Sequence, residues 1–171
     1  MNSNLHEPPM RDQRNILSPD LQDNNNPLVL VVEDHADTRE MLRILLNMMG
    51  CRVIEAGDGE QAMSVAEKGH PDLILLDVKI PLLDGLTVAR LIRSHPVLNK
   101  VPIVLITGME TPQLRREALS AGCNDCLIKP LDFERLQEFI KLVATPRSPA
   151  LRSHYSLVVR SRGAICSYDF Q

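Results

Sequence analysis

The chain has 171 residues, of which 44% are hydrophobic and 24% charged, and its formal net charge is −3. This composition is that of an ordinary soluble protein with one folded domain and some additional sequence, and the charge does not favour a general nucleic-acid binder. No apolar run approaches the roughly 18 residues of a membrane-spanning helix, and no secretory signal is visible, so a cytoplasmic protein without a membrane association is expected.

The two ends of the chain differ in composition from its middle. Residues 1–27 combine asparagines with prolines and are expected to form a flexible leader, because they hold too few apolar side chains to offset the entropy lost on ordering. Residues 145–171 carry several arginines and are expected to form a basic, solvated tail without a recognisable output domain. The single folded domain is therefore predicted to span residues 28–144.

Within residues 28–144, short apolar runs alternate with helical spacings of apolar residues, which predicts five strands that are each followed by a helix. The predicted strands are 28–32, 51–55, 72–76, 101–106 and 124–128. The helices that follow are marked by Leu42, Leu45, Leu46 and Met49; by Ala62, Val65 and Ala66; by Leu86, Ala89 and Ile92; by Leu114, Ala118 and Ala121; and by Leu136, Phe139, Ile140 and Val143. Glycine or proline follows each helix, as at Gly50 and Gly122.

Strands that alternate with helices indicate an α/β fold, in which a parallel sheet is covered by helices on both faces. Residues 28–32 and 73–76 are apolar at every position, as strands buried on both faces require. Arg52 and Glu55 place the second strand nearer an edge of the sheet. The simplest arrangement is a doubly wound, flavodoxin-like (βα)5 sheet with the strand order 2-1-3-4-5.

Polar side chains follow four of the predicted strands. Glu33 and Asp34 follow the first strand, Asp77 the third, Thr107 the fourth and Lys129 the fifth. In the order 2-1-3-4-5, the first and third strands flank the switch point at which such sheets bind ligands, so the carboxylates should converge on one crevice. One lysine cannot balance three carboxylates, whereas Mg²⁺ prefers carboxylate, water and phosphate oxygens. Singly, these residues could cap a helix, form a turn or face solvent; together they predict a magnesium site and phosphate chemistry.

These residues and their neighbours resemble the receiver domain of two-component response regulators. The resemblance covers about residues 28–143 and lies in the stretches Val31-Val32-Glu33-Asp34, Leu75 to Gly85, Ile106-Thr107-Gly108, Ala121-Gly122 and Leu127-Ile128-Lys129-Pro130. It implies that Asp77 accepts a phosphoryl group from a histidine kinase or a phosphotransfer protein. It further implies that Asp34, Asp77, the backbone carbonyl of Lys79 and, through water, Glu33 hold Mg²⁺, that Lys129 and Thr107 contact the phosphoryl group, and that Lys129–Pro130 is a cis peptide.

The resemblance implies a phosphorylation-dependent signalling switch rather than an enzyme. Phosphorylation would change the surface around the fourth helix, the fifth strand and the last helix, where an unknown downstream protein or a second copy would bind. Candidate polar contacts on this surface are Arg115, Arg116, Asp125, Glu134 and Arg135. Cys126 departs from the family, because it stands three residues before the lysine, where an aromatic switch residue is usual.

Other interpretations follow from single features of the sequence. A docking module that never takes a phosphoryl group is compatible with Cys126. An aspartyl-phosphate hydrolase of the haloacid-dehalogenase type expects a second aspartate where Lys79 stands. A nucleotide-hydrolysing protein would need a P-loop motif, which the sequence lacks. A flavin-binding protein would need more aromatic residues than Phe133 and Phe139, the only two before the tail. Cys123 and Cys126 form a Cys-x-x-Cys stretch, but no thioredoxin-like context or further zinc ligands accompany it.

Overall fold

The structure, a computed structural model, describes residues 26–144 and contains five strands and five helices in strict alternation. The strands are β1 (Leu28–Val32), β2 (Arg52–Ala56), β3 (Leu73–Asp77), β4 (Ile103–Thr107) and β5 (Asp125–Ile128), and the helices are α1 (Ala36–Met48), α2 (Gly59–Gly69), α3 (Gly85–Ser94), α4 (Pro112–Ser120) and α5 (Phe133–Ala144). The strands pair in parallel in the order β2-β1-β3-β4-β5. The flavodoxin-like fold and the strand order predicted from the sequence are therefore confirmed, including the edge position of β2.

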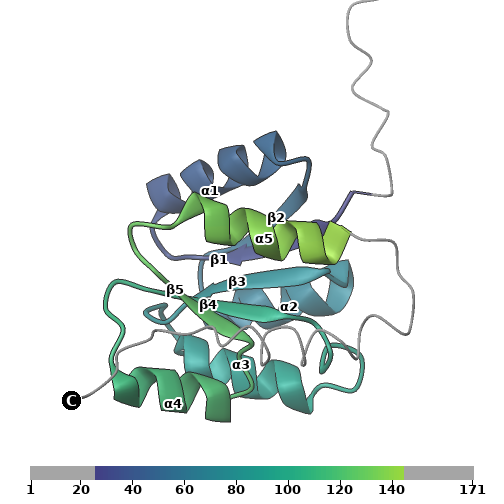
Figure 1. Cartoon of the computed structure of the whole chain (residues 1–171). Coiled ribbons are helices and arrows are strands. Elements are labelled where there is room, and N and C mark those ends of the chain that lie inside the picture. The colour runs from purple at the N-terminus through teal and green to yellow at the C-terminus, as the bar shows by residue number, and fades with distance from the viewer. Residues whose placement is uncertain (1–25, 145–171) are drawn as a thin grey trace, which may run out of the picture.

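The helices cover both faces of the sheet (Figure 1). Helices α1 and α5 lie on one face, and α2, α3 and α4 lie on the other. Because successive side chains of a strand point to opposite faces, Val29 and Val31 pack toward α1 and α5, whereas Leu30 and Val32 pack toward α2 and α3. Every residue of such a strand is buried, which explains the unbroken apolar runs in the sequence.

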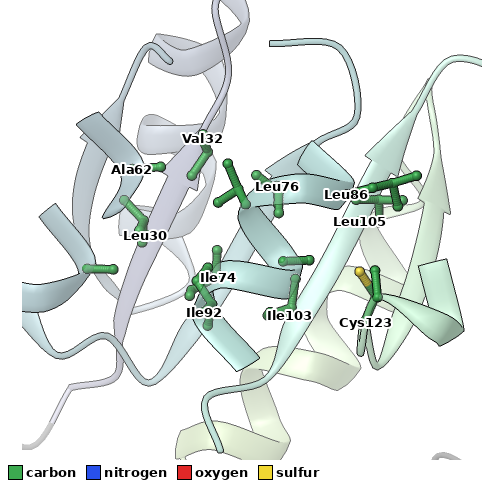
Figure 2. Close-up of a cluster of buried hydrophobic side chains, with 14 of the residues drawn as sticks. Leu30, Val32, Ala62, Ile74, Leu76, Leu86, Ile92, Ile103, Leu105 and Cys123 are labelled. Carbon is green, nitrogen blue, oxygen red and sulfur yellow. The ribbon is translucent and has the colours of Figure 1, made fainter. Parts of the chain in front are cut away.

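The larger of the two cores lies between the sheet and the helices α2, α3 and α4 (Figure 2). Its aliphatic side chains come from the three central strands and from the inward faces of these helices, and most are fully buried. Burial of each large aliphatic side chain stabilises the fold by about 1.5–3 kcal/mol. Labelled members include Leu30, Val32, Ala62, Ile74, Leu76, Leu86, Ile92, Ile103, Leu105 and Cys123.

Strand β3 begins and ends one residue later than predicted, at Leu73–Asp77 rather than 72–76. At its start, the carboxylate of Asp72 accepts a hydrogen bond from the backbone N–H of Leu28. At its end, the ladder continues past the apolar run, because Asp77 pairs with Ile106 and the next N–H, from Val78, donates to the Ile106 carbonyl. Asp77 is therefore part of the rigid strand.

Strands β2 and β4 are displaced for similar local reasons. Cys51 does not begin β2, because its N–H donates to the carbonyl of Leu46 at the end of α1. Strand β4 begins at Ile103 because Pro102, the residue before it, has no N–H to donate to a neighbouring strand. The carbonyl of Pro102 still accepts a hydrogen bond from the N–H of Ile74. Each strand still ends at the same edge of the sheet, so the polar residues that follow the strands gather there.

The predicted leader and tail, residues 1–27 and 145–171, lie outside the described residues except for Asn26 and Pro27. Between residues 26 and 144, none of the helices combines the length and apolarity needed to cross a bilayer.

Candidate functional site

The acid pair follows β1 at the carboxyl edge of the sheet. Glu33 is only 1% exposed, and its backbone N–H donates to the carbonyl of Ala56, which ties the end of β1 to the end of β2. Asp34 is the next residue and is exposed. Helix α1 begins two residues later, and no side chain caps its first turn. The Asp34 carboxylate is therefore not used as a helix cap, and its partner is the neighbouring side chain of His35.

His35 belongs to the same cluster, although the sequence reasoning did not single it out. Its Nδ1 lies 2.8 Å from Asp34 Oδ1 and 3.4 Å from Glu33 Oε1. The hydrogen bond with Asp34 raises the pKa of His35. Slight burial opposes ionisation of the Asp34 carboxyl, but the same hydrogen bond outweighs it and lowers the pKa of Asp34. In the sequence, only the position of His35 directly after two acidic residues at a strand end indicates that it belongs to this cluster.

Asp77 ends β3 and is 5% exposed. Its Oδ1 accepts a hydrogen bond of 2.8 Å from the backbone N–H of Lys79, which places the Lys79 backbone beside the carboxylate. The first residue of α3, Gly85, packs directly on this strand end, since a Cβ atom at Gly85 would lie 2.2 Å from the carbonyl oxygen of Asp77. The close approach of α3 to the end of β3 therefore requires glycine at position 85, and the loop between Asp77 and α3 closes only with this approach.

Lys129 joins the acid pair to Asp77. Its Nζ donates to Glu33 Oε2 at 2.7 Å and makes a short contact with Asp77 Oδ2. Burial opposes the ammonium charge, but the hydrogen bonds to Asp77 and Glu33 outweigh it and hold the Lys129 pKa above its usual value. Residues that follow β1 and β5 thus meet the last residue of β3, as the strand order predicts. The peptide bond from Lys129 to Pro130 is cis.

The charges of this site do not balance. The three carboxylates are contacted by one lysine and one exposed histidine, while the nearby Arg39 binds backbone carbonyls instead. Burial raises the pKa of Glu33 in spite of the hydrogen bond from Lys129. The ligand atoms of Glu33, Asp34 and His35 lie within 4.8 Å of one another. Carboxylate oxygens in excess of cationic partners fit a small, hard divalent cation such as Mg²⁺. The group formed by Glu33, Asp34 and His35 is chemically suited to that ion, and the predicted ligand set of Glu33, Asp34, Asp77 and the Lys79 carbonyl stays a prediction.

Thr107 lies at the same edge, but its hydroxyl is engaged elsewhere. The residue is 6% exposed and ends β4, where its carbonyl accepts from the N–H of Lys129. Its Oγ1 donates to the Met109 carbonyl at 2.9 Å and accepts from the Met109 N–H at 3.2 Å. In this state the hydroxyl holds the loop between β4 and α4 and contacts none of the acids.

Cys126 lies in the core rather than at the edge. It is buried in β5 opposite Leu105, in the cluster that packs against α2, α3 and α4. Burial raises the thiol pKa to about 12 for Cys126 and to about 11 for Cys123, and both cysteines are free. Such thiols stay protonated at neutral pH, which disfavours the redox and zinc interpretations of the Cys-x-x-Cys stretch.

With this geometry established, comparison with known proteins identifies the family. The family model described as the response regulator receiver domain matches residues 29–141. The chain belongs to the response regulator receiver domain family. Among solved receiver structures, that of a sensor histidine kinase from Pseudomonas aeruginosa, which holds a magnesium ion in its active site cleft, is 34% identical, with a TM-score of 0.64 over 70% of this chain and 98% of that one. Chemotaxis protein CheY4 of Vibrio cholerae is 29% identical, with a TM-score of 0.65 over 69% of this chain and 98% of its own.

The curated relatives are longer proteins. The "probable transcriptional regulator ycf27" of Porphyridium aerugineum is 35% identical over 115 residues, which are 67% of this chain and 47% of that relative. The response regulator PleD of Caulobacter vibrioides is 38% identical over 104 residues, or 61% of this chain and 23% of PleD. The chain thus spans about half the length of the ycf27 regulator, and the receiver domain is the part that they share.

Proposed function

We propose that the protein is a phosphorylation-dependent switch of a two-component or phosphorelay system, in which Asp77 accepts a phosphoryl group from the phosphohistidine of a histidine kinase or phosphotransfer protein. The observation that carries this proposal is the contact of one ammonium, Lys129 Nζ, with both Glu33 and Asp77 at the carboxyl edge of a receiver-domain sheet. Membership of the receiver family, with its regulators of two-component signalling, supports the same role.

The residues of the site divide the chemistry among them. Asp77 Oδ attacks the phosphorus, and the bond to the imidazole nitrogen breaks as the transition state passes in line. Asp34, Asp77, the Lys79 carbonyl and, through water, Glu33 would hold Mg²⁺, which supplies positive charge for the phosphoryl oxygens. Lys129 moves from the Asp77 carboxylate to those oxygens and neutralises a further part of their charge. The rigid end of β3 keeps the nucleophile in place throughout.

Thr107 converts the new charge into a movement. Its hydroxyl leaves the Met109 backbone and donates to a phosphoryl oxygen, so the loop between β4 and α4 rearranges. A thiol at position 126 is too small to follow this movement as an aromatic ring would. The loop itself, rather than a side-chain rotation in β5, therefore carries the change to the surface.

The surface formed by α4, β5 and α5 is the proposed output face, and its partner is a downstream protein or a second copy of the chain. In the resting state two of its arginines are paired within the domain, Arg135 with Asp125 at 3.0 Å and Arg115 with Glu110 at 3.1 Å. Exposed large apolar side chains of these three elements are Leu119, Ile128, Phe133 and Leu142. Sedimentation with and without beryllofluoride tests the homodimer, and a monomer under both conditions would leave a different protein as the partner.

The direct test of the proposed function is incubation with Mg²⁺ and a small phosphodonor such as acetyl phosphate or phosphoramidate, followed by intact mass spectrometry. We expect a single phosphoryl adduct that is absent from Asp77→Asn. Asp72→Asn is the matched control, because Asp72 precedes the opposite end of the same strand and its carboxylate accepts from the Leu28 N–H. Retention of the adduct by Asp77→Asn would refute the assignment. No adduct with any donor would favour the docking module that works without phosphorylation.

A further inference from the structure

The side chain of Arg39 reaches back from α1 to the acid pair. Its Nη1 donates to the backbone carbonyl of Glu33 at 2.7 Å and to that of Asp34 at 3.3 Å. Its Nε lies 3.8 Å from the carboxylate of Glu55 on β2. Arg39 is only a quarter exposed, so this arrangement is enclosed by the loop and the neighbouring strand rather than spread into solvent.

These hydrogen bonds fix the backbone and do not use the carboxylate oxygens of Glu33 and Asp34. The Glu33 N–H is already held by the Ala56 carbonyl, so with Arg39 bound to the Glu33 carbonyl both sides of this residue are anchored. A guanidinium that formed ion pairs with the acids would compete with a divalent cation for the same oxygens. A guanidinium on the two carbonyls does not occupy those oxygens, so it can support the loop while the carboxylate oxygens stay available to the cation.

We propose that Arg39 is a positioning residue of the receiver site, which holds the backbone of Glu33 and Asp34 in the geometry that binds a divalent cation. The inference rests on the proposed function, because it concerns the same acid pair. It goes beyond that function in giving the acid pair a dedicated support from α1. A support of this kind acts on the affinity for the cation, whereas a side chain that only joins α1 to β2 acts on the stability of the fold.

Mn²⁺ binding separates these two roles, because it reports on the acid pair without any phosphoryl transfer. The full chain is titrated with Mn²⁺ and the free ion is measured by electron paramagnetic resonance. We expect Arg39→Ala to bind Mn²⁺ about tenfold more weakly than the unmodified chain, the lower end of what loss of a supporting hydrogen bond costs a metal site. Arg39→Lys, which keeps the charge but loses the forked donor, should lose about threefold, as a partial replacement of the guanidinium bonds.

Two matched controls belong to the same corner of the fold. Arg43 lies one turn further along α1 and pairs with Glu40 instead of the loop, so Arg43→Ala should leave Mn²⁺ affinity unchanged. Glu55→Gln removes the ion pair of Arg39 with β2 but keeps both carbonyl hydrogen bonds, and should also leave the affinity unchanged. Thermal unfolding of every variant without metal measures the structural effect separately.

The outcomes are distinct. Equal Mn²⁺ affinity of Arg39→Ala and the unmodified chain, whatever the melting temperatures, would overturn the inference and leave the proposed function intact. If Arg39→Ala does not fold, the Arg39→Lys titration decides, and an unchanged affinity there would equally overturn it. If the unmodified chain takes no Mn²⁺ and no phosphoryl group, the proposed function itself fails and the inference fails with it.

Discussion

Two partly buried cations at opposite ends of the sheet, Lys129 and Arg93, are bound in opposite ways. At the carboxyl edge, Lys129 contacts two buried carboxylates. At the other end, Arg93 closes α3 against the starts of β4 and β5 through neutral oxygens. Its hydrogen bonds go to the carbonyls of Gly122 at 2.8 Å, Val101 at 2.7 Å and Asn99 at 3.2 Å, and to Asn124 Oδ1 at 2.8 Å.

This difference separates the scaffold from the site. The donors of Arg93 are distributed over four oxygens that the fold itself supplies, and Asn124 Oδ1 also accepts from the Ile103 N–H. Burial lowers the pKa of Arg93, and no carboxylate is needed to hold it. Lys129, in contrast, stands among more negative charge than it can neutralise. A region whose polar groups are satisfied internally resists change, whereas a region with excess charge responds to a ligand.

The largest effect on stability is expected at the neutral end. Arg93→Ala leaves four acceptors without this partner, and we expect a loss of about 3 kcal/mol of unfolding free energy. Phosphoryl acceptance per folded molecule should stay unchanged, because the site lies at the other edge. Urea unfolding and the mass assay measure the two quantities. Arg90→Ala, an exposed position on the same helix, is the control and should cost less than about 0.5 kcal/mol.

Gly85 and Gly122 lie in close contact with the backbone or side chains at opposite ends of the sheet, so their substitutions compare the two ends. Gly85→Ala would place a Cβ 2.2 Å from the Asp77 carbonyl, and Gly122→Ala, at φ +88°, would place one 2.6 Å from Arg93 Cγ. Each should cost about 2 kcal/mol of unfolding free energy, as overpacking and strain do. Only Gly85→Ala should also lower phosphoryl acceptance per folded molecule, because it displaces the end of β3. Equal acceptance by both variants would show that Asp77 tolerates a shift of α3.

Removal of the Lys129 side chain should make the stability of the fold depend more strongly on Mg²⁺. Without Lys129 the carboxylates of Glu33 and Asp77 lose their ammonium, so Mg²⁺ should stabilise Lys129→Ala more than the unmodified chain. A tenfold gain in affinity would add about 1.4 kcal/mol at saturating Mg²⁺. Thermal unfolding in EDTA and in Mg²⁺ measures this difference, with Lys68→Ala on α2 as the control. A smaller Mg²⁺ response in Lys129→Ala than in the unmodified chain would contradict the charge argument.

The smallest effect concerns the start of α3. Asp84 accepts from the Thr87 N–H at 3.0 Å and from the Thr87 hydroxyl at 2.7 Å, and these bonds lower its pKa. Asp84→Ala should therefore cost about 1 kcal/mol at neutral pH. Because a lowered carboxyl pKa stabilises the fold above the usual aspartate range, this cost should shrink as the pH falls through the lowered value.

The control for this pH dependence is the cap of α4. Thr111 accepts from the Leu114 N–H at 3.0 Å with an uncharged hydroxyl. Thr111→Ala should cost a similar amount at neutral pH, and its cost should not depend on the ionisation of the cap. Chemical unfolding of both variants between pH 3 and pH 7 makes the comparison, and parallel curves would contradict the assignment of the pH effect to Asp84.

The sequence predicts the fold well because strand burial and helix periodicity are local patterns. The strand at residues 28–32 is found with the predicted bounds, and the order of strands places Glu33, Asp77 and Lys129 together. The contacts of Arg39 and Arg93 could not be predicted in the same way. Each binds backbone oxygens, which every residue possesses, and for Arg93 these backbone oxygens lie up to 29 residues away along the chain. The resting partner of the Thr107 hydroxyl was likewise missed, since a turn toward Met109 leaves no sequence pattern.

If the protein is the phosphorylation-dependent switch proposed above, the two hydrogen bonds between Thr107 and Met109 set a threshold for its activation. A hydroxyl without partners would turn toward any passing anion, including free phosphate or an incompletely transferred group. Under the proposed function, the hydroxyl must give up its donor bond to the Met109 carbonyl before it can donate to a phosphoryl group on Asp77. The loop before α4 would thereby limit signalling by the unphosphorylated protein, although β5 has a cysteine where an aromatic switch residue is usual.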